Sequence, residues 1–155
     1  MKHIYPAIFS KNTDKPSYSV IVPDLPGCAA NGDSLLEAIE NTEDAALGWL
    51  LDVLEAGQFP PPSSELSDFE LAPDQFCSLL VLDIDSYAEK FGANAVRKNL
   101  TIPAWLNAFA LAREINFSAV LTDALHQIYC EEFEREQAKH NDFKHSTQSE
   151  SEGKE

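Results

Sequence analysis

Three polar side chains alternate along a short stretch in the second half of the chain. Arg97, Asn99 and Thr101 occupy every second position of VRKNLTIPAW, residues 96–105, and share one face if the stretch is extended. Guanidinium, amide and hydroxyl groups can hydrogen-bond to the edges of DNA bases, but they also commonly face water on an ordinary strand. The pattern alone leaves both interpretations open.

The charge around this stretch differs from that of the rest of the chain, whose formal net charge is −15. Residues 1–94 hold 4 Lys or Arg and 16 Asp or Glu, a net charge of −12. Residues 95–130 hold 3 and 2, a net charge of +1. An acidic first part repels nucleic acid and attracts basic partners, so any contact with DNA is expected in the second part.

Asp83 and Asp85 are a second chemical possibility, because two carboxylates close together could share a metal ion. Acids at strand ends are usually solvated, and the pattern offers no clear third ligand. Ser34 lacks a G-x-S-x-G setting, and the four histidines and three cysteines show no ligand spacing. We therefore expect no metal, no cofactor and no enzymatic activity. A metal-dependent nuclease is the least favoured alternative.

The location of the protein is predicted from the same composition. The odd number of widely spaced cysteines favours reduced thiols, the start shows no secretion signal, and no apolar run could span a bilayer. The sequence predicts a cytoplasmic protein with no membrane partner.

The first part of the chain is predicted to form a small sheet and one long helix. The expected strands are His3–Ser10, Tyr18–Val22, Cys28–Asn31 and a buried strand at Phe76–Ile84. Ser34 and Glu37 fit a capping box at the start of the helix, and Gly57 is a plausible stop. A short turn of helix is expected within residues 86–95.

The second part is predicted to form a strand at residues 96–102, a helix over Pro103–Glu114 and another helix capped by Asn116. From about Arg135 the sequence is polar and aperiodic, which predicts disorder. One strand and two helices cannot bury their apolar stripes alone. The simplest solution pairs the strand antiparallel with its copy from a second chain.

The segments KNLTIPAWLNAF and NFSAVLTDAL resemble the ribbon-helix-helix family of DNA-binding domains. In that family, the paired strands enter the major groove. The resemblance implies base contacts from Arg97, Asn99 and Thr101. It also implies phosphate contacts from Lys98 and from the helix start at Asn116, Phe117 and Ser118. The stretch has few basic neighbours, which departs from the family pattern and predicts weak, salt-sensitive non-specific binding.

The stretch VPDLPGCAANGDSLLEAIENTEDAAL, residues 22–47, is similar to the HicB antitoxin family. The resemblance implies a reduced RNase H-like N-terminal domain that covers the active site of a small, basic, mRNA-cleaving HicA toxin. The −12 charge of this part suits such a partner. Asp24, Leu25 and Pro26 are candidate toxin contacts, although these residues could equally serve only to shape a turn.

Together, these features predict an α+β protein with an N-terminal antiparallel sheet packed on a helix and a C-terminal ribbon-helix-helix that dimerises. The expected divisions are residues 1–92 for toxin binding, 95–134 for DNA binding and dimerisation, and 135–155 for a disordered tail. The predicted partners are a HicA-like toxin and operator DNA, and the predicted role is an antitoxin that represses its own operon. The expected assembly is a homodimer, or a higher even-numbered oligomer through the N-terminal sheets. An orphan transcriptional regulator without a toxin is the alternative.

Overall fold

The computed structural model describes residues 1–91 and 95–151, with side chains up to residue 140. The chain divides into two compact units, Met1–Ala95 and Val96–Glu155, which we call the N-terminal and C-terminal units. No helix in the described part is long and apolar enough to cross a membrane.

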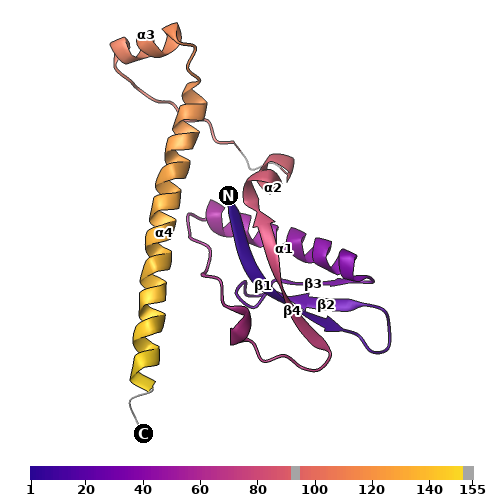
Figure 1. Ribbon diagram of the computed structural model, residues 1–155. Coiled ribbons are helices and arrows are strands. Elements are labelled where there is room, and N and C mark those ends of the chain that lie inside the picture. Colours follow the sequence, from indigo (N-terminus) through magenta and orange to yellow (C-terminus); the bar gives the residue numbers. More distant parts are fainter. Residues whose placement is uncertain (92–94, 152–155) are drawn as a thin grey trace. The chain divides into compact units, whose positions relative to one another are not determined.

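The N-terminal unit is built on a four-stranded antiparallel sheet (Figure 1). Its strands, in the spatial order β3-β2-β1-β4, are β1 (Lys2–Lys11), β2 (Tyr18–Ile21), β3 (Ala29–Gly32) and β4 (Gln75–Asp83). The turn between β1 and β2 is closed by the Asn12 N–H, which donates to the Ser17 carbonyl at 2.9 Å. The predicted hairpin and third strand are therefore confirmed.

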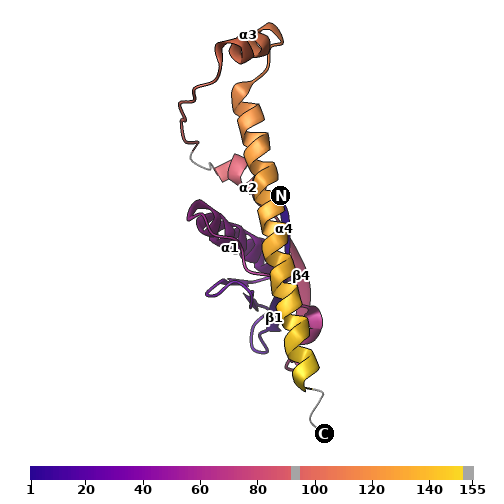
Figure 2. The ribbon, with the colours of Figure 1, turned by 90° about the vertical axis from the view of Figure 1, so that its left-hand side faces the viewer.

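One face of the sheet carries the core. Tyr5, Ala7 and Phe9 alternate along β1 and are buried, and their neighbours across the sheet include Leu80 on β4. Helix α1 (Leu35–Glu55) runs along this face (Figures 1 and 2). Its buried residues recur every four positions, which gives the helix one apolar side to set against the sheet. They are Ala38, Thr42, Ala46 and Leu50.

Helix α1 begins where the sequence predicts, with one difference in its cap. The Ser34 hydroxyl oxygen accepts a hydrogen bond from the Glu37 N–H at 3.1 Å, as in a capping box. The Glu37 carboxylate accepts from the N–H of Asp33 at 2.9 Å, one residue earlier than the capping box requires. The carboxylate therefore secures the chain just before the helix.

The end of α1 is a Schellman motif centred on Gly57, which has a φ of 71°. The Gly57 N–H donates to the Leu54 carbonyl at 2.9 Å, and the Gln58 N–H donates to the Val53 carbonyl at 3.0 Å. Glycine suits this position because the left-handed region costs it nothing. The predicted stop is confirmed.

The strand predicted at Phe76–Ile84 exists as β4, but only one of its faces, with Leu80 and Leu82, is buried as predicted. Leu79 is 49% exposed and Val81 is 55% exposed. β4 lies at an edge of the sheet and pairs with β1, and α1 covers only the other face. The connection from α1 contains a 3-10 turn, η1 (Leu66–Asp68), and β4 leads directly into α2 (Ile84–Phe91).

The described part of the C-terminal unit contains two helices, α3 (Ala104–Ala112) and α4 (Phe117–Ser151). Both predicted helices are confirmed, but residues 95–103 form neither helix nor strand in the single chain. The predicted strand at 96–102 is therefore absent here, because a strand needs a hydrogen-bonded neighbour and no described strand lies beside it. Its pairing with a second chain stays a prediction.

Helix α4 continues past residue 135, where the sequence predicted disorder. Two ion pairs at i,i+3 spacing support this part of the helix, Arg135 with Glu132 and Lys139 with Glu136, each at 2.6 Å. The expectation of a disordered tail does not match the structure over residues 135–151. Residues 152–155 lie outside the described part.

Candidate functional site

The segment before α3 presents every predicted base-contacting side chain to solvent. Arg97, Asn99 and Thr101 are exposed, and so is Lys98. The apolar residues between them are exposed as well, and Val96 reaches 72%. A segment with both polar and apolar side chains in water is available for pairing with another chain.

Helix α3 also leaves its apolar side in water. Trp105 is 72% exposed, and Leu106 and Phe109 are exposed beside it. The guanidinium of Arg113 lies 4.1 Å from the centre of the Phe109 ring, a cation–π contact. Ala110 is the only buried apolar side chain between residues 96 and 140. In the described part of the single chain, Trp105 therefore has no apolar core around it.

The turn from α3 to α4 is another Schellman motif, but its left-handed residue is Glu114, with a φ of 53°. The Glu114 N–H donates to the Leu111 carbonyl at 3.2 Å, and the Ile115 N–H donates to the Ala110 carbonyl at 3.0 Å. A side chain other than glycine is strained in this region. The turn therefore positions the start of α4 at the expense of backbone strain at Glu114.

The start of α4 is capped as the sequence predicts. The Asn116 side-chain oxygen accepts from the Ala119 N–H at 3.1 Å. The N–H groups of Phe117 and Ser118, in the first turn, have no intrahelical acceptor because no helical residue precedes them. Those two groups can donate to a phosphate, whereas the Asn116 oxygen is already committed to the cap.

The predicted toxin-contacting loop is partly buried and is hydrogen-bonded to other parts of the N-terminal unit. Leu25 is 0% exposed and belongs to the core, so its side chain is not available to a partner and the prediction for it is corrected. The Asp24 carboxylate accepts from the hydroxyl and the N–H of Ser64. Pro26 is exposed, and its carbonyl accepts from the Trp49 indole N–H at 3.2 Å.

The motif around residues 31–41 also has a structural role that the sequence pattern did not reveal. A Cβ on Gly32 would lie 2.3 Å from the backbone nitrogen of Ala38, so only glycine permits this close approach of β3 to α1. The Asn41 amide donates to the Asn31 carbonyl at 2.8 Å, between the same two elements. These motif residues hold β3 close against α1.

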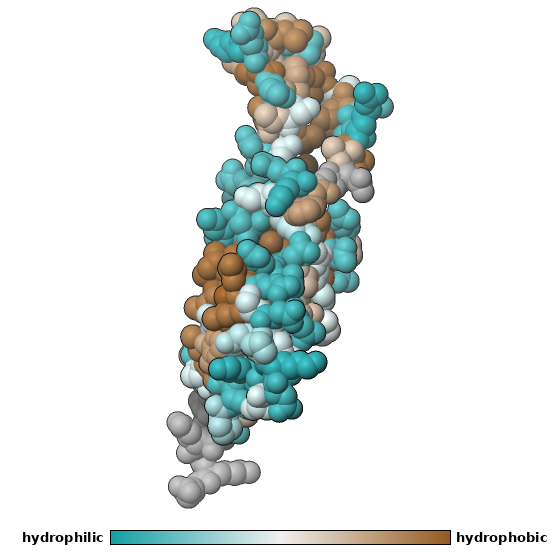
Figure 3. Space-filling view, turned by 90° about the vertical axis from the view of Figure 1, so that its right-hand side faces the viewer, coloured by the Kyte–Doolittle hydropathy of each residue, from teal (hydrophilic) through white to brown (hydrophobic). Residues whose placement is uncertain are grey.

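The outward face of the sheet is apolar, and sequence reasoning missed it. Cross-strand partners share a face, so Ile4 lies beside Val81, and Ile8 lies beside Ile21. We call Ile4, Ile8, Ile21, Leu79 and Val81 the outer patch; all but Ile8 are about half exposed. Figure 3 shows an apolar patch along one side of the part that holds the sheet. The sequence of β4 is apolar on both faces, and this pattern could have indicated an apolar outward face.

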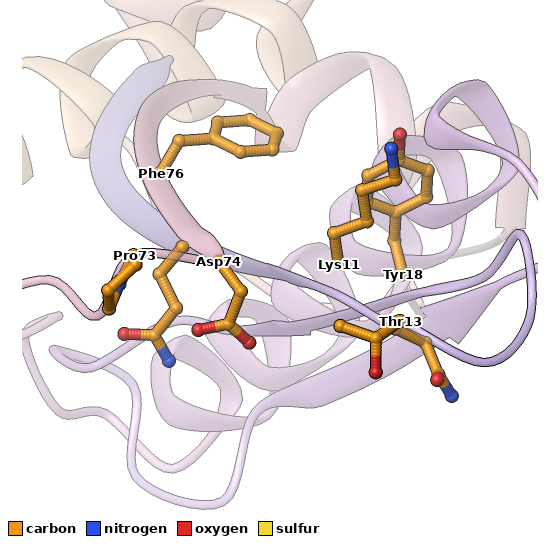
Figure 4. A pocket seen from close by; sticks show the side chains of 8 residues that line it. Lys11, Thr13, Tyr18, Pro73, Asp74 and Phe76 are labelled. Atoms are coloured by element: carbon orange, nitrogen blue, oxygen red, sulfur yellow. The ribbon is translucent and has the colours of Figure 1, made fainter.

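An open pocket of about 430 Å³ lies between the β1–β2 hairpin and the start of β4 (Figure 4). Lys11 and Tyr18 stand on one side of it and Phe76 on the other. Its full lining is Lys11, Asn12, Thr13, Tyr18, Pro73, Asp74, Gln75 and Phe76. No predicted site residue lines this pocket.

The alternative metal site at Asp83 and Asp85 is not assembled in the described residues, where no three His, Cys, Asp or Glu side chains form a metal-binding group. The Asp83 carboxylate pairs with Lys2 at 3.9 Å, and Asp85 pairs with the N-terminal amine of Met1. Both carboxylates thus have structural partners.

Two of the three thiols lie in surroundings that make them less reactive. Burial raises the pKa of the Cys28 thiol. Burial also raises the pKa of Cys77, against a smaller opposing effect of a hydrogen bond from the Ser78 backbone. Because the thiolate is the nucleophile, neither environment favours nucleophilic catalysis.

The chain resembles known proteins over most of its length. Residues 5–122 match the family described as HicB-like antitoxin of bacterial toxin-antitoxin system. A protein of Haemophilus phage HP1, described as an uncharacterized 14.9 kDa protein in the rep-hol intergenic region, is 31% identical over 103 residues, which cover 66% of this chain and 75% of the phage protein.

Solved structures resemble the fold. A toxin–antitoxin complex from Streptococcus pneumoniae includes a chain with a TM-score of 0.54 and 25% identity, and the match covers 82% of this chain and 99% of that one. The antitoxin HicB of Burkholderia pseudomallei matches with a TM-score of 0.48 and 24% identity, over 79% of this chain and 96% of its own.

The α+β class predicted from the sequence is confirmed by the sheet and helices described above. The family match includes both the sheet with its motif and the α3–α4 helices up to residue 122. The chain therefore belongs to the HicB-like antitoxin family.

Proposed function

We propose that this antitoxin neutralises a small, basic HicA-like toxin with its N-terminal unit and represses its own operon with its C-terminal unit. The observation that carries the second half is the exposure of the C-terminal unit, in which Ala110 is the only buried apolar residue between residues 96 and 140. A unit of this kind needs a second chain to form a core.

The DNA-binding surface is formed by two copies of residues 96–102 paired antiparallel. In that arrangement Val96, Leu100 and Ile102 face the helices of both chains. Arg97, Asn99 and Thr101 project from the opposite face into the major groove. Lys98 and the N–H groups of Phe117 and Ser118 contact the phosphates. The exposure of all these groups in the single chain supports this proposal.

The toxin-binding surface lies on the acidic N-terminal unit. Residues 1–94 carry 16 acidic side chains against 4 basic ones, which suits a cationic RNA-binding partner. Within the loop at residues 23–27, Pro26 contacts the toxin. The buried Leu25 side chain and the hydrogen bonds from Ser64 to Asp24 hold the loop in place. The resemblance to a chain of the Streptococcus pneumoniae toxin–antitoxin complex supports a toxin partner.

A gel-shift assay on the DNA upstream of the chain's own reading frame tests the repressor role. Arg97→Ala and Asn99→Ala should each weaken specific binding about 10- to 100-fold, since a bidentate base contact contributes about 1–3 kcal/mol. Arg135→Ala is the matched control, because it removes the same charge from α4 beyond the helix start. Unchanged binding in both strand variants would rule out base recognition by this strand.

A separate assay tests the toxin-binding role. Purified chain, added in equal amount to the product of the adjacent reading frame, should stop RNA cleavage by that product and co-elute with it. If no neighbouring product binds while operator binding persists, the chain is an orphan regulator.

A further inference from the structure

The open pocket beside the β1–β2 hairpin holds an ammonium group and a carboxylate that point away from each other. Lys11 on β1 is the cross-strand partner of Tyr18 on β2, so their side chains lie next to each other on one face of the sheet. The Lys11 N–H donates to the Asp74 carbonyl at 3.1 Å, which places the start of β4 on the other side of Lys11. Figure 4 shows the Lys11 and Tyr18 side chains extending one way and the Asp74 carboxylate extending the other way. The pocket therefore offers both charges to one ligand.

The polar groups of the pocket are not used by the fold. Among the residues that the structure describes, the Lys11 ammonium pairs with no carboxylate, whereas Lys2 on the same strand pairs with Asp83 at 3.9 Å. Within the same residues, neither the Tyr18 hydroxyl nor the Asp74 carboxylate has a hydrogen-bond partner. All three groups are thus available to a bound molecule.

An aromatic ring forms the opposite wall. The rings of Phe76 and Phe9 are stacked, with 4.9 Å between their centres and 8° between their planes. Phe9 is buried, but Phe76 is 39% exposed and lines the pocket across from Lys11 and Tyr18 (Figure 4). A ring that is held by one neighbour and open on its other side gives a flat apolar surface on which a second ring can pack.

We propose that this pocket binds a free aromatic α-amino acid in its zwitterionic form. The carboxylate of the ligand accepts hydrogen bonds from the Lys11 ammonium and the Tyr18 hydroxyl. Its ammonium donates to the Asp74 carboxylate, and its ring packs on Phe76. The volume of about 430 Å³ lies within the range of small-molecule sites, about 300–1,000 Å³. None of the residues named above for contact with toxin or DNA lines this pocket, so the ligand site is separate from both.

The test compares three probes on the full chain: L-phenylalanine, L-phenylalaninamide, which lacks the carboxylate, and N-acetyl-L-phenylalanine, which lacks the ammonium group. NMR titrations follow the backbone amide signals of Lys11 and Thr13. L-Phenylalanine should bind about 10-fold more tightly than either derivative, because each derivative loses one charge-assisted hydrogen bond.

The net charge of the chain predicts a different order. A chain with a net charge of −15 attracts the cationic phenylalaninamide most and the anionic N-acetyl derivative least. Tightest binding of the zwitterion therefore cannot result from general attraction. Phenylalaninamide binding as tightly as L-phenylalanine would overturn the proposal, and so would the absence of any change at Lys11 and Thr13 with L-phenylalanine at millimolar concentration.

Variants locate each contact. Lys11→Gln should weaken L-phenylalanine binding about 10-fold and change phenylalaninamide binding much less, because the amide has no carboxylate for Lys11 to contact. Asp74→Asn should weaken L-phenylalanine and phenylalaninamide but not N-acetyl-L-phenylalanine. Lys15→Gln is the matched control, because it removes the same charge from the exposed hairpin turn and Lys15 does not line the pocket.

Circular dichroism shows whether each variant is folded. An equal loss of L-phenylalanine binding in Lys15→Gln, or unchanged binding in folded Lys11→Gln, would show that the pocket does not recognise the ligand as proposed.

Discussion

The carboxylate of Asp24 accepts two hydrogen bonds from Ser64, one from the backbone N–H at 2.9 Å and one from the hydroxyl at 2.6 Å. Asp24 lies in the loop between β2 and β3, and Ser64 lies in the long connection between α1 and β4. The Tyr5 hydroxyl donates to the Pro61 carbonyl at 2.6 Å in the same connection. These contacts hold a connection that has little regular structure of its own.

Removing this carboxylate should therefore destabilise the N-terminal unit. Asp24→Ala leaves the part-buried Ser64 N–H without its acceptor and should lower the free energy of unfolding by about 1–3 kcal/mol. Ser64→Ala removes only the hydroxyl bond and should cost about 1 kcal/mol. Urea unfolding followed by Trp49 fluorescence, in a Trp105→Phe background, measures both changes. Asp14→Ala, in an exposed turn, is the control, and an equally large loss there would show that charge alone is responsible.

Two glycine substitutions should have effects of opposite sign. Gly32→Ala forces a Cβ to within 2.3 Å of the Ala38 nitrogen, so β3 and α1 must separate and the unit should lose at least about 1–3 kcal/mol. Gly48→Ala, within α1, meets only the Tyr87 hydroxyl at 3.7 Å and should gain about 0.5–1 kcal/mol. Thermal unfolding of the two variants side by side checks this. A destabilised Gly48→Ala would contradict the finding that a Cβ here meets only the Tyr87 hydroxyl.

Replacing Glu114 with glycine should stabilise the turn between α3 and α4. The residue has a φ of 53°, and glycine removes about 1 kcal/mol of strain in that region. The same change at Glu134, within α4, should cost about 1 kcal/mol because glycine is a poor helix former. Circular dichroism melts at one fixed chain concentration compare the two. If Glu114→Gly also lowers the melting temperature, the turn is not strained.

The stability of the N-terminal unit should depend on pH through His3. Burial, and to a lesser extent the positive N-terminal amine, lower the pKa of His3 below its usual 6.5. The unfolded chain therefore takes up a proton before the folded one does. Stability is fully present above about pH 6.5 and is lost as the pH falls through the folded pKa.

Urea unfolding between neutral pH and about pH 5 measures this loss, which His3→Gln should reduce. His140→Gln removes an exposed histidine on α4 and should leave the pH dependence as it was. An identical profile in His3→Gln would show that other groups cause it.

Local signals in the sequence were sufficient for most helix boundaries. Ser34 and Asn116 are short polar side chains placed just before apolar periodic stretches, and both cap helices in the structure. Gly57 ends α1 because its backbone can adopt the left-handed conformation. Such features depend on a few neighbouring residues, so a pattern can predict them.

Burial and pairing could not be predicted in the same way, because they depend on distant parts of the chain or on other molecules. From the sequence alone, the apolar side chains of Leu79 and Val81 look like core residues. In the structure β4 is an edge strand, and α1 covers the face of the sheet opposite to these two side chains. Leu25 lies in a loop rich in proline and is nevertheless fully buried. Residues 96–102 have the alternation of a strand, but no strand in the described part of the single chain lies beside them.

The near absence of a core among residues 96–140 has a consequence for how such a protein would behave in a cell. If its folded form exists only in pairs, the amount of that form rises with the square of the concentration of single chains. When synthesis slows, the paired population shrinks faster than the total. Occupancy of a promoter by such a protein would then end abruptly instead of declining in step with supply.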